Sequence, residues 1–225
     1  MRFDRWLLAG LLLAGATPAM ADLRDDLTQT AFVTTDKAQA IAQLQQAIRT
    51  ADGLLAGKPG DREATMQRAV AIGYRAKLTR SRSDAVAVKK IFDQLAASNP
   101  RDPEAQMLLA TWNLDAVDQL GGFLAKTALG ARREAGEAAL ANAVALSGGR
   151  PFFTGLAALL RIRLDPANVA AARTLAEAAA KAPAATPLDR LMKRDAALIL
   201  PILQRGDGKA AAALAEKMLP FGRLG

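Results

Sequence analysis

One spacing recurs along this chain and restricts its fold: a small residue, a large apolar residue four positions later, and another apolar residue three positions after that. Side chains at positions i, i+4 and i+7 share one face of an α-helix, so each copy predicts a helix packed against a partner helix. Proline follows two of the copies, as it often follows helices. The copies are Val88, Phe92 and Leu95 before Pro100, Ala171, Leu175 and Ala178 before Pro183, and the less regular Gly136, Leu140 and Ala143.

Composition also favours helices. Alanine supplies 52 of the 225 residues, and aromatic residues make up only 4%. Alanine has the highest helix propensity, whereas strands prefer the β-branched and aromatic residues that are scarce here. The chain is therefore expected to be all-α, with a core of alanine and leucine ridges. Residues 22–225 are long enough for one domain that needs no disulfide, and the sequence contains no cysteine.

The first 21 residues have the pattern of a secretory signal peptide. Arg2 and Arg5 precede an apolar run at residues 7–16, and Ala19-Met20-Ala21 supplies small residues for cleavage after Ala21. A membrane anchor is the alternative, but the run is shorter than the roughly 20 residues that span a bilayer. The mature chain is therefore expected to be exported without a transmembrane anchor, and to be periplasmic in a Gram-negative host.

Breaker residues divide the rest into helices. The expected helices cover residues 36–56, 61–79 and 84–97, and a fourth begins at Asp102-Pro103-Glu104, because proline and acids suit a first helical turn. Later turns are expected at residues 148–151, 165–166, 183–187 and 206–208. Eight to ten helices result, and their short connections predict antiparallel pairs.

The helix pairs resemble tetratricopeptide repeats between Met66 and Leu219. Residues 171–183 match the second-helix half of that pattern, residues 102–114 look like a first helix, and residues 206–219 look like a final turn and second helix. The chain departs from the family at Leu95, where alanine is expected. Its small positions Val88, Gly136, Ala171 and Ala211 are also 48, 35 and 40 residues apart, against about 34 in regular repeats.

The resemblance implies a short right-handed solenoid whose concave face binds a peptide, a partner protein or a small ligand. In that register Lys77, Arg80 and Arg163 come near the concave side. The asparagine and lysine set of the family's carboxylate-clamp members is not recognisable, so that ligand class does not carry over. The arrangement also loosely resembles exported helical-repeat proteins that accompany bacterial transporters or envelope assemblies.

Residues 112–130 break the repeat and form an insert. The insert contains Trp112, a Gly-Gly pair, Phe123 and Lys126. Glycines permit close approach of a ligand and an aromatic residue can anchor a partner, so the insert is a candidate site. Alternatively, it is a kinked connector whose Trp112 and Phe123 fill the space between helix pairs.

Positive charge is concentrated between residues 68 and 90. Seven basic residues face only Asp84 there, and the chain keeps a formal charge of +7 once residues 1–21 are removed. Such a run suits an acidic small ligand, an acidic peptide or an anionic lipid surface, or is a solvated helix face. Nucleic acid is not expected as a partner, because an exported protein rarely meets it and Tyr74 is the one aromatic residue within the run.

The sequence gives little support to a catalytic function. Histidine and cysteine are absent, which removes the commonest general base, the thiol nucleophile and most transition-metal ligands. The acidic pairs Asp115 with Asp118 and Glu134 with Glu137 lack a surrounding oxygen-rich loop, and no nucleophile-elbow or phosphate-loop motif occurs. We therefore expect no catalytic site, no metal and no cofactor.

Two functions remain at this point. The first is an exported adaptor or scaffold that binds another envelope protein or a peptide. The second is a small-ligand or lipid-binding accessory protein, for example of a transporter, with its groove near residues 112–130. Under either function, the candidate binding residues are Trp112, Phe123, Lys126, Lys77, Arg80 and Arg163.

Overall fold

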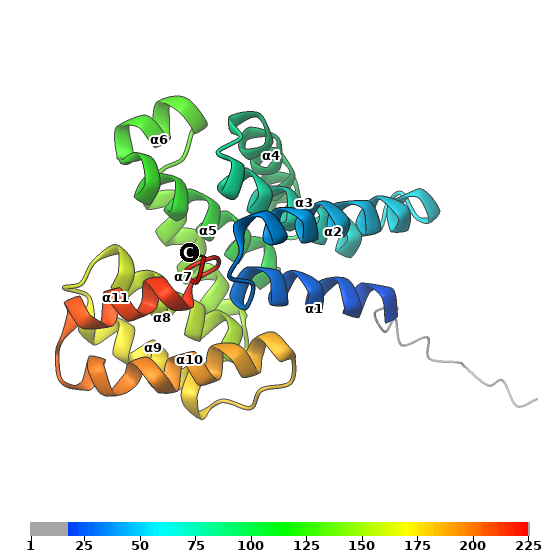
Figure 1. Cartoon of the computed structure of the whole chain (residues 1–225). Coiled ribbons are helices and arrows are strands. Elements are labelled where there is room, and N and C mark those ends of the chain that lie inside the picture. The colour runs from blue at the N-terminus through cyan, green and yellow to red at the C-terminus, as the bar shows by residue number, and fades with distance from the viewer. Residues whose placement is uncertain (1–17, 225) are drawn as a thin grey trace, which may run out of the picture.

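A computed structural model describes residues 18–224, and this part of the chain is all-α, as its composition predicted (Figure 1). It contains eleven helices: α1 (Pro18–Phe32), α2 (Lys37–Gly57), α3 (Arg62–Thr79), α4 (Arg82–Ser98), α5 (Pro103–Leu120), α6 (Gly122–Leu129), α7 (Arg133–Leu146), α8 (Pro151–Leu164), α9 (Val169–Lys181), α10 (Pro187–Gln204) and α11 (Gly208–Met218). The number exceeds the eight to ten expected. One reason is that Gly121, with φ +74°, ends α5 and separates the short α6 from it.

The helices begin where their capping residues predicted. The carboxylate of Asp36 accepts a hydrogen bond from the Gln39 backbone, and that of Asp61 accepts one from Ala64, at 2.7 and 3.0 Å. Asp102 caps α5 in the same way, with Pro103 in the first turn. Each cap satisfies a backbone N–H that has no partner within its own helix.

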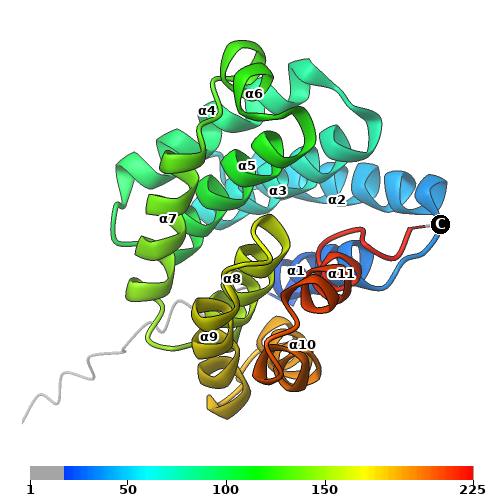
Figure 2. The same cartoon turned by 90° about the vertical axis from the view of Figure 1, so that its left-hand side faces the viewer.

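Helices that follow one another in the chain pack together in pairs. α2 packs on α3, α8 on α9 and α9 on α10, while α5 packs on α7 across the intervening α6. Figure 2 shows α2–α7 as one arc and α8–α11 as a second group, with α1 between them. The sequential, antiparallel packing agrees with the prediction.

The predicted i, i+4, i+7 faces are buried on α4 and α7, but the register predicted for α9 is wrong. Ala171 and Ala178 are exposed and Leu175 is half-buried. The residues one position later form the buried face, at Ala172, Ala176 and Ala179. The helix contains alanine on every side, so the sequence pattern fits two adjacent registers, and only packing distinguishes them.

Small residues let particular helices approach closely. A Cβ atom added to Gly155 of α8 would lie 2.9 Å from the backbone oxygen of Met192 in α10. One added to Gly136 of α7 would lie 2.8 Å from Cγ of Leu114 in α5. Both distances are below ordinary van der Waals contact, so these glycines are the contact points of their helix pairs.

The C-terminal segment packs against the end of α1. The backbone N–H of Phe221 donates a 2.7 Å hydrogen bond to the carbonyl oxygen of Ala31 at the end of α1. Both cartoon views place the C-terminal segment beside α1 (Figures 1 and 2). The segment after α11 therefore returns to the start of the fold.

Most of the predicted signal peptide, residues 1–17, lies outside the described residues. Residues 18–21 belong to the first turn of α1, where Met20 is buried. Within residues 18–224, none of the helices is both long and apolar enough to cross a membrane.

Candidate functional site

A cleft of about 700 Å³ runs between the helices and is the main candidate site. α1, α3, α5 and α8 form most of its lining, together with the start of α10, residues 219–222 and Leu224. Its volume lies within the range of about 300–1,000 Å³ that is typical of small-molecule sites.

An ion-pair network shows that α3, α5, α8 and α10 begin at the same end of the cleft. Arg24 of α1 binds Glu63 of α3 at 2.6 Å and Glu104 of α5 at 2.7 Å. Arg150, directly before α8, lies 3.8 Å from Glu104 and 3.2 Å from Asp189 in the first turn of α10. Acidic side chains at helix N-termini are also favoured by the helix dipoles.

The Arg24 guanidinium stays charged in this network. Burial alone would lower its pKa, but the hydrogen bonds to Glu63 and Glu104 outweigh burial and raise the pKa above its ordinary value. Arg24 therefore remains a cation at physiological pH.

Asp189 joins α8 to α10 from a fully buried position. It accepts hydrogen bonds from the Thr186 hydroxyl at 2.8 Å, from the Phe152 backbone N–H at 3.1 Å and from Arg150 at 3.2 Å. Burial alone raises the pKa of Asp189, but these hydrogen bonds outweigh it and hold the pKa below the ordinary value. The first turns of α8 and α10 thus share one carboxylate.

A second set of ion pairs lies at the opposite end, where the lining helices finish. Lys77 of α3 binds Asp115 of α5 at 2.7 Å, and Arg163 of α8 lies 3.8 Å from Asp115 and binds Asp118. Basic side chains at helix C-termini are favoured by the dipoles. The helices α3, α5 and α8 therefore run parallel along the cleft, each with its C-terminus at this end.

The wall between the two charged ends is mostly apolar. α3, α5 and α8 each contribute two residues to its middle, and these are Met66, Val70, Met107, Leu108, Leu156 and Leu160. The apolar middle with charged ends suits an elongated ligand that is apolar over most of its length.

The C-terminal segment covers part of the cleft. Phe221 adopts a positive φ of +66°, and its ring meets the Tyr74 ring edge-on, with centroids 5.1 Å apart. Burial, followed by the nearby charge of Asp115, raises the pKa of the Tyr74 phenol. Tyr74 is therefore neutral at physiological pH and serves as an apolar wall residue.

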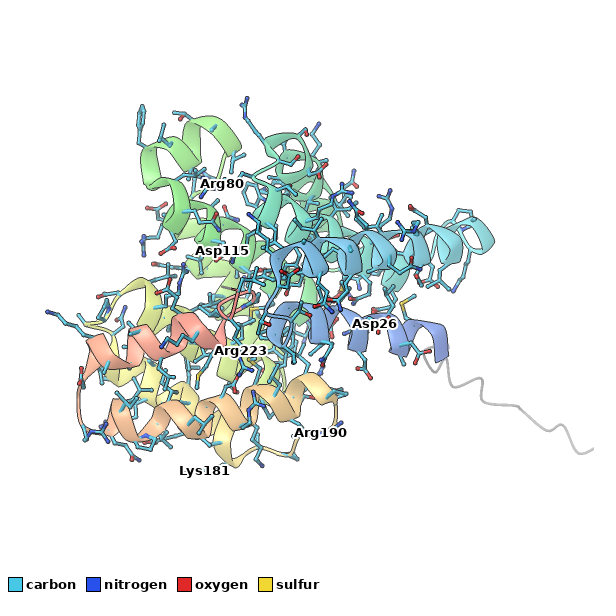
Figure 3. All side chains as sticks on the ribbon, viewed as in Figure 1. Asp26, Arg80, Asp115, Lys181, Arg190 and Arg223 are labelled. Carbon is cyan, nitrogen blue, oxygen red and sulfur yellow. The ribbon has the colours of Figure 1, made fainter. Side chains whose placement is uncertain are left out.

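Four of the six predicted binding residues line the cleft: Trp112, Lys77, Arg80 and Arg163. The Trp112 indole donates a 3.2 Å hydrogen bond to the Ala85 carbonyl, and the ammonium of Lys89 lies 5.5 Å from its ring centroid. In Figure 3, Arg80 lies just below α6 on the side of the molecule that also carries Asp115. Trp112 of α5 thus packs against α4 and also lines the cleft.

Phe123 and Lys126, the other two predicted residues, are not among the residues that line the cleft. Both lie on α6, where Phe123 is 79% exposed and Lys126 is also exposed. The insert therefore divides: α5 residues up to Gln119 line the cleft, whereas α6 projects from the outside of the fold.

Sequence reasoning missed the contribution of α1 and of the last residues. Arg24 and Glu104 were not singled out, because their meeting depends on helices 80 residues apart. The segment after the last helix was not placed at the site from sequence. An aromatic residue between proline and glycine, Phe221, was the available sequence signal that this segment packs back on the fold.

Within residues 18–224, no group of three or more acidic side chains has a geometry that could hold a metal ion. Asp115 and Asp118 are engaged with Lys77 and Arg163, and Glu137 lies 3.7 Å from Arg133. Comparison with known proteins gives no match to a family model, to a curated protein or to a solved structure.

Proposed function

We propose that this protein is an exported, non-catalytic binding protein that holds an elongated and largely apolar ligand in the cleft between α1, α3, α5 and α8. The observation that carries the proposal is the cleft itself, about 700 Å³ with apolar walls and charged ends. An empty apolar cleft of this size leaves wall surface in contact with water, and a matching ligand removes that surface.

The charges at the ends narrow the ligand class. Arg24 and Arg150 are paired with carboxylates, as are Lys77 and Arg163, so the ligand need not neutralise them. A highly charged ligand would have to break these pairs, which costs more than it returns when a partner is left unpaired. The proposed ligand is therefore amphiphilic, with its polar group at an end of the cleft.

A tetratricopeptide-like scaffold is part of the proposal. Five helices bury the same i, i+4, i+7 face after a small or β-branched first residue, and these first residues are Ala40, Val88, Gly136, Ala172 and Ala211. They recur at irregular intervals. The parallel order of α3, α5 and α8 along the cleft is the order expected for the first helices of such a stack.

The experiment uses a blocking substitution with a matched control. Val70→Trp places an indole in the middle of the cleft, whereas Val33→Trp places the same group at an exposed site. Dansyl-undecanoic acid serves as the fluorescent probe. We expect saturable binding by the wild type and by Val33→Trp. Val70→Trp should bind with about tenfold lower affinity, because the indole occupies the space in which about two CH2 groups of the probe would be buried. Equal binding by all three would reject the cleft as the site.

The adaptor function is the second candidate, and one observation favours it. Residues 220–222 and Leu224, which follow the last helix, form part of the cleft wall, and the Phe221 backbone N–H donates a hydrogen bond to the Ala31 carbonyl. A peptide of a partner protein could use the same walls after displacing this segment. Native mass spectrometry of protein purified from its host separates the candidates: a small added mass supports the ligand, and a copurifying polypeptide supports the adaptor.

A further inference from the structure

Apolar side chains are exposed at the tip of the insert, outside the cleft. Among the described residues, five large apolar side chains are strongly exposed, and three of them lie together: Leu120 at 41%, Phe123 at 79% and Leu124 at 55%. Both cartoon views place α6 at the periphery of the molecule (Figures 1 and 2). Neither the fold nor the proposed ligand uses these side chains.

α6 is held from one side only. Ala125 is fully buried and packs with Val117 and Ala131, so the opposite face points outward. Helical geometry puts Phe123, Leu124 and Lys126 on that outward half. Gly121 and Gly130, with φ +74° and +75°, set the direction of the helix at its two ends. The exposed face therefore results from a fixed local structure.

The tip carries only positive charge. No acidic residue occurs between Gln119 and Arg133, while Lys126 lies among the exposed apolar side chains. Arg82 reaches the end of α6, where its Nε donates a 3.0 Å hydrogen bond to the Ala128 carbonyl. Asp118, the nearest preceding acid, is paired with Arg163. The surface is thus apolar at its centre and basic around it.

We infer that the tip formed by Leu120, Phe123, Leu124 and Lys126 docks this protein on an anionic lipid surface. Phe and Leu side chains insert at the boundary of headgroups and acyl chains, and each nearby Lys or Arg is attracted to anionic lipid. Lys126 can extend its ammonium to the headgroups while its stem stays with the apolar side chains.

Size favours a lipid surface over a protein partner. A stable protein–protein interface needs about 800 Å² on each partner, which three side chains on a short helix do not supply. Shallow insertion of a few apolar side chains with basic neighbours is sufficient for reversible membrane docking. The basic composition matches anionic headgroups in charge.

Docking at this tip also orients the cleft. Gln119, adjacent to Leu120, lines the cleft, and so does the exposed Arg80 at the end of α3. The end of the cleft where the lining helices finish therefore lies next to the docking tip. The docking proposal goes beyond ligand binding and stands without it, because vesicle binding is measured separately from loading of the cleft.

Vesicle flotation tests the docking proposal. The sample is the exported form of the protein, purified from the cells that produce it. Vesicles of equal parts phosphatidylcholine and phosphatidylglycerol are compared with vesicles of phosphatidylcholine alone. We expect the wild type to bind the anionic vesicles preferentially and less strongly at high salt. The double variant Phe123→Ser/Leu124→Ser should bind them about tenfold more weakly, and Lys126→Glu should also weaken binding.

Leu198→Ser is the matched control, because Leu198 of α10 is 55% exposed, as is Leu124. The control should bind as the wild type does, and thermal unfolding should show that all variants remain folded. Unchanged binding by the folded double variant overturns the docking proposal, as does equal binding to neutral vesicles. A dimer that depends on Phe123, without vesicle binding, would instead assign the tip to contact between copies of this chain.

Discussion

Replacing Asp189 with asparagine tests the junction that holds one end of the cleft together. The carboxylate is completely buried and connects the first turns of α8 and α10. One oxygen accepts from the Phe152 backbone, and the other accepts from Thr186 and Arg150. The asparagine side chain keeps one acceptor, but its amide group then faces groups that donate hydrogen bonds.

The expected loss is about 3 kcal/mol of unfolding free energy. A hydrogen bond to a charged group contributes about 1.5–3 kcal/mol, and the substitution weakens two to three of them without additivity. In a domain of this size, such a loss lowers Tm by about 10 °C. Asp207→Asn is the control, since Asp207 caps α11 through one exposed hydrogen bond and asparagine caps equally well.

The pH dependence adds a second measurement to this prediction. The pKa of Asp189 is lowered in the folded state, so its stabilising contribution is present above the ordinary value of about 4 and is lost as pH falls through the folded value. The difference in unfolding free energy between the wild type and Asp189→Asn should therefore decrease as the pH falls. Burial raises the pKa of Asp195 despite its contact with Arg194, so its ionisation opposes folding above the ordinary pKa.

Urea unfolding from pH 7 to pH 3 distinguishes the two carboxylates. The advantage of wild type over Asp189→Asn should decrease as pH falls, whereas the stability of wild type relative to Asp195→Asn should increase. If Asp189→Asn costs no more than Asp207→Asn at pH 7, the shared carboxylate does not hold α8 to α10. If the wild type gains or loses stability relative to both variants as the pH falls, the opposite pKa shifts assigned to Asp189 and Asp195 are wrong.

Three further substitutions, two of them with a matched control variant, test the packing by urea and thermal unfolding. Gly155→Ala should cost about 1–3 kcal/mol by overpacking against α10, whereas Gly53→Ala, with open space around it, should gain up to about 1 kcal/mol; equal effects would refute the close approach. Ala172→Glu should be strongly destabilising and Ala171→Glu nearly neutral, and the opposite order would restore the register expected from sequence. Phe221→Ala should cost about 3 kcal/mol, and an unchanged Tm would show that the C-terminal segment is not packed.

Local signals predicted the helices well because their causes are local. Asp36, Asp61 and Asp102 each bond a backbone N–H two or three residues away. Pro103 suits a first turn whatever the helix packs against. Such signals are fully contained in a few consecutive residues, so the sequence shows them directly.

The register of α9 could not be predicted in the same way. Ala171 and Ala172 have the same side chain, so their order along the helix carries no information about which one faces the core. On α4 and α7 the large residues of the pattern, Phe92 and Leu140, are buried, whereas on α9 Leu175 is half-buried and Ala176 takes the core position. Alanine-rich helices are therefore easy to locate and difficult to orient.

The cleft was only partly predictable because its charged ends depend on long-range pairs. Lys77, Arg80 and Arg163 were placed on the concave side from the repeat register, and they line the cleft. Arg24 was not considered, since nothing near it in sequence indicates Glu63 and Glu104 as partners 39 and 80 residues away. A resemblance that begins at Met66 could not include α1.

The basic run between residues 68 and 90 illustrates how folding redistributes charge. Four of the basic residues are in ion pairs: Arg68 with Asp52, Arg75 with Asp84, Lys77 with Asp115, and Lys89 with Asp93. Of these partners, Asp52, Asp93 and Asp115 lie outside the run. Those pairs reduce the charge available to a partner along the run. Arg80 and Arg82 lie at the turn between α3 and α4, and Arg82 bonds the end of α6. Arg80 and Arg82 thus bring positive charge beside the exposed side chains of α6, and the proposal of an anionic lipid surface as the partner rests on these two features together.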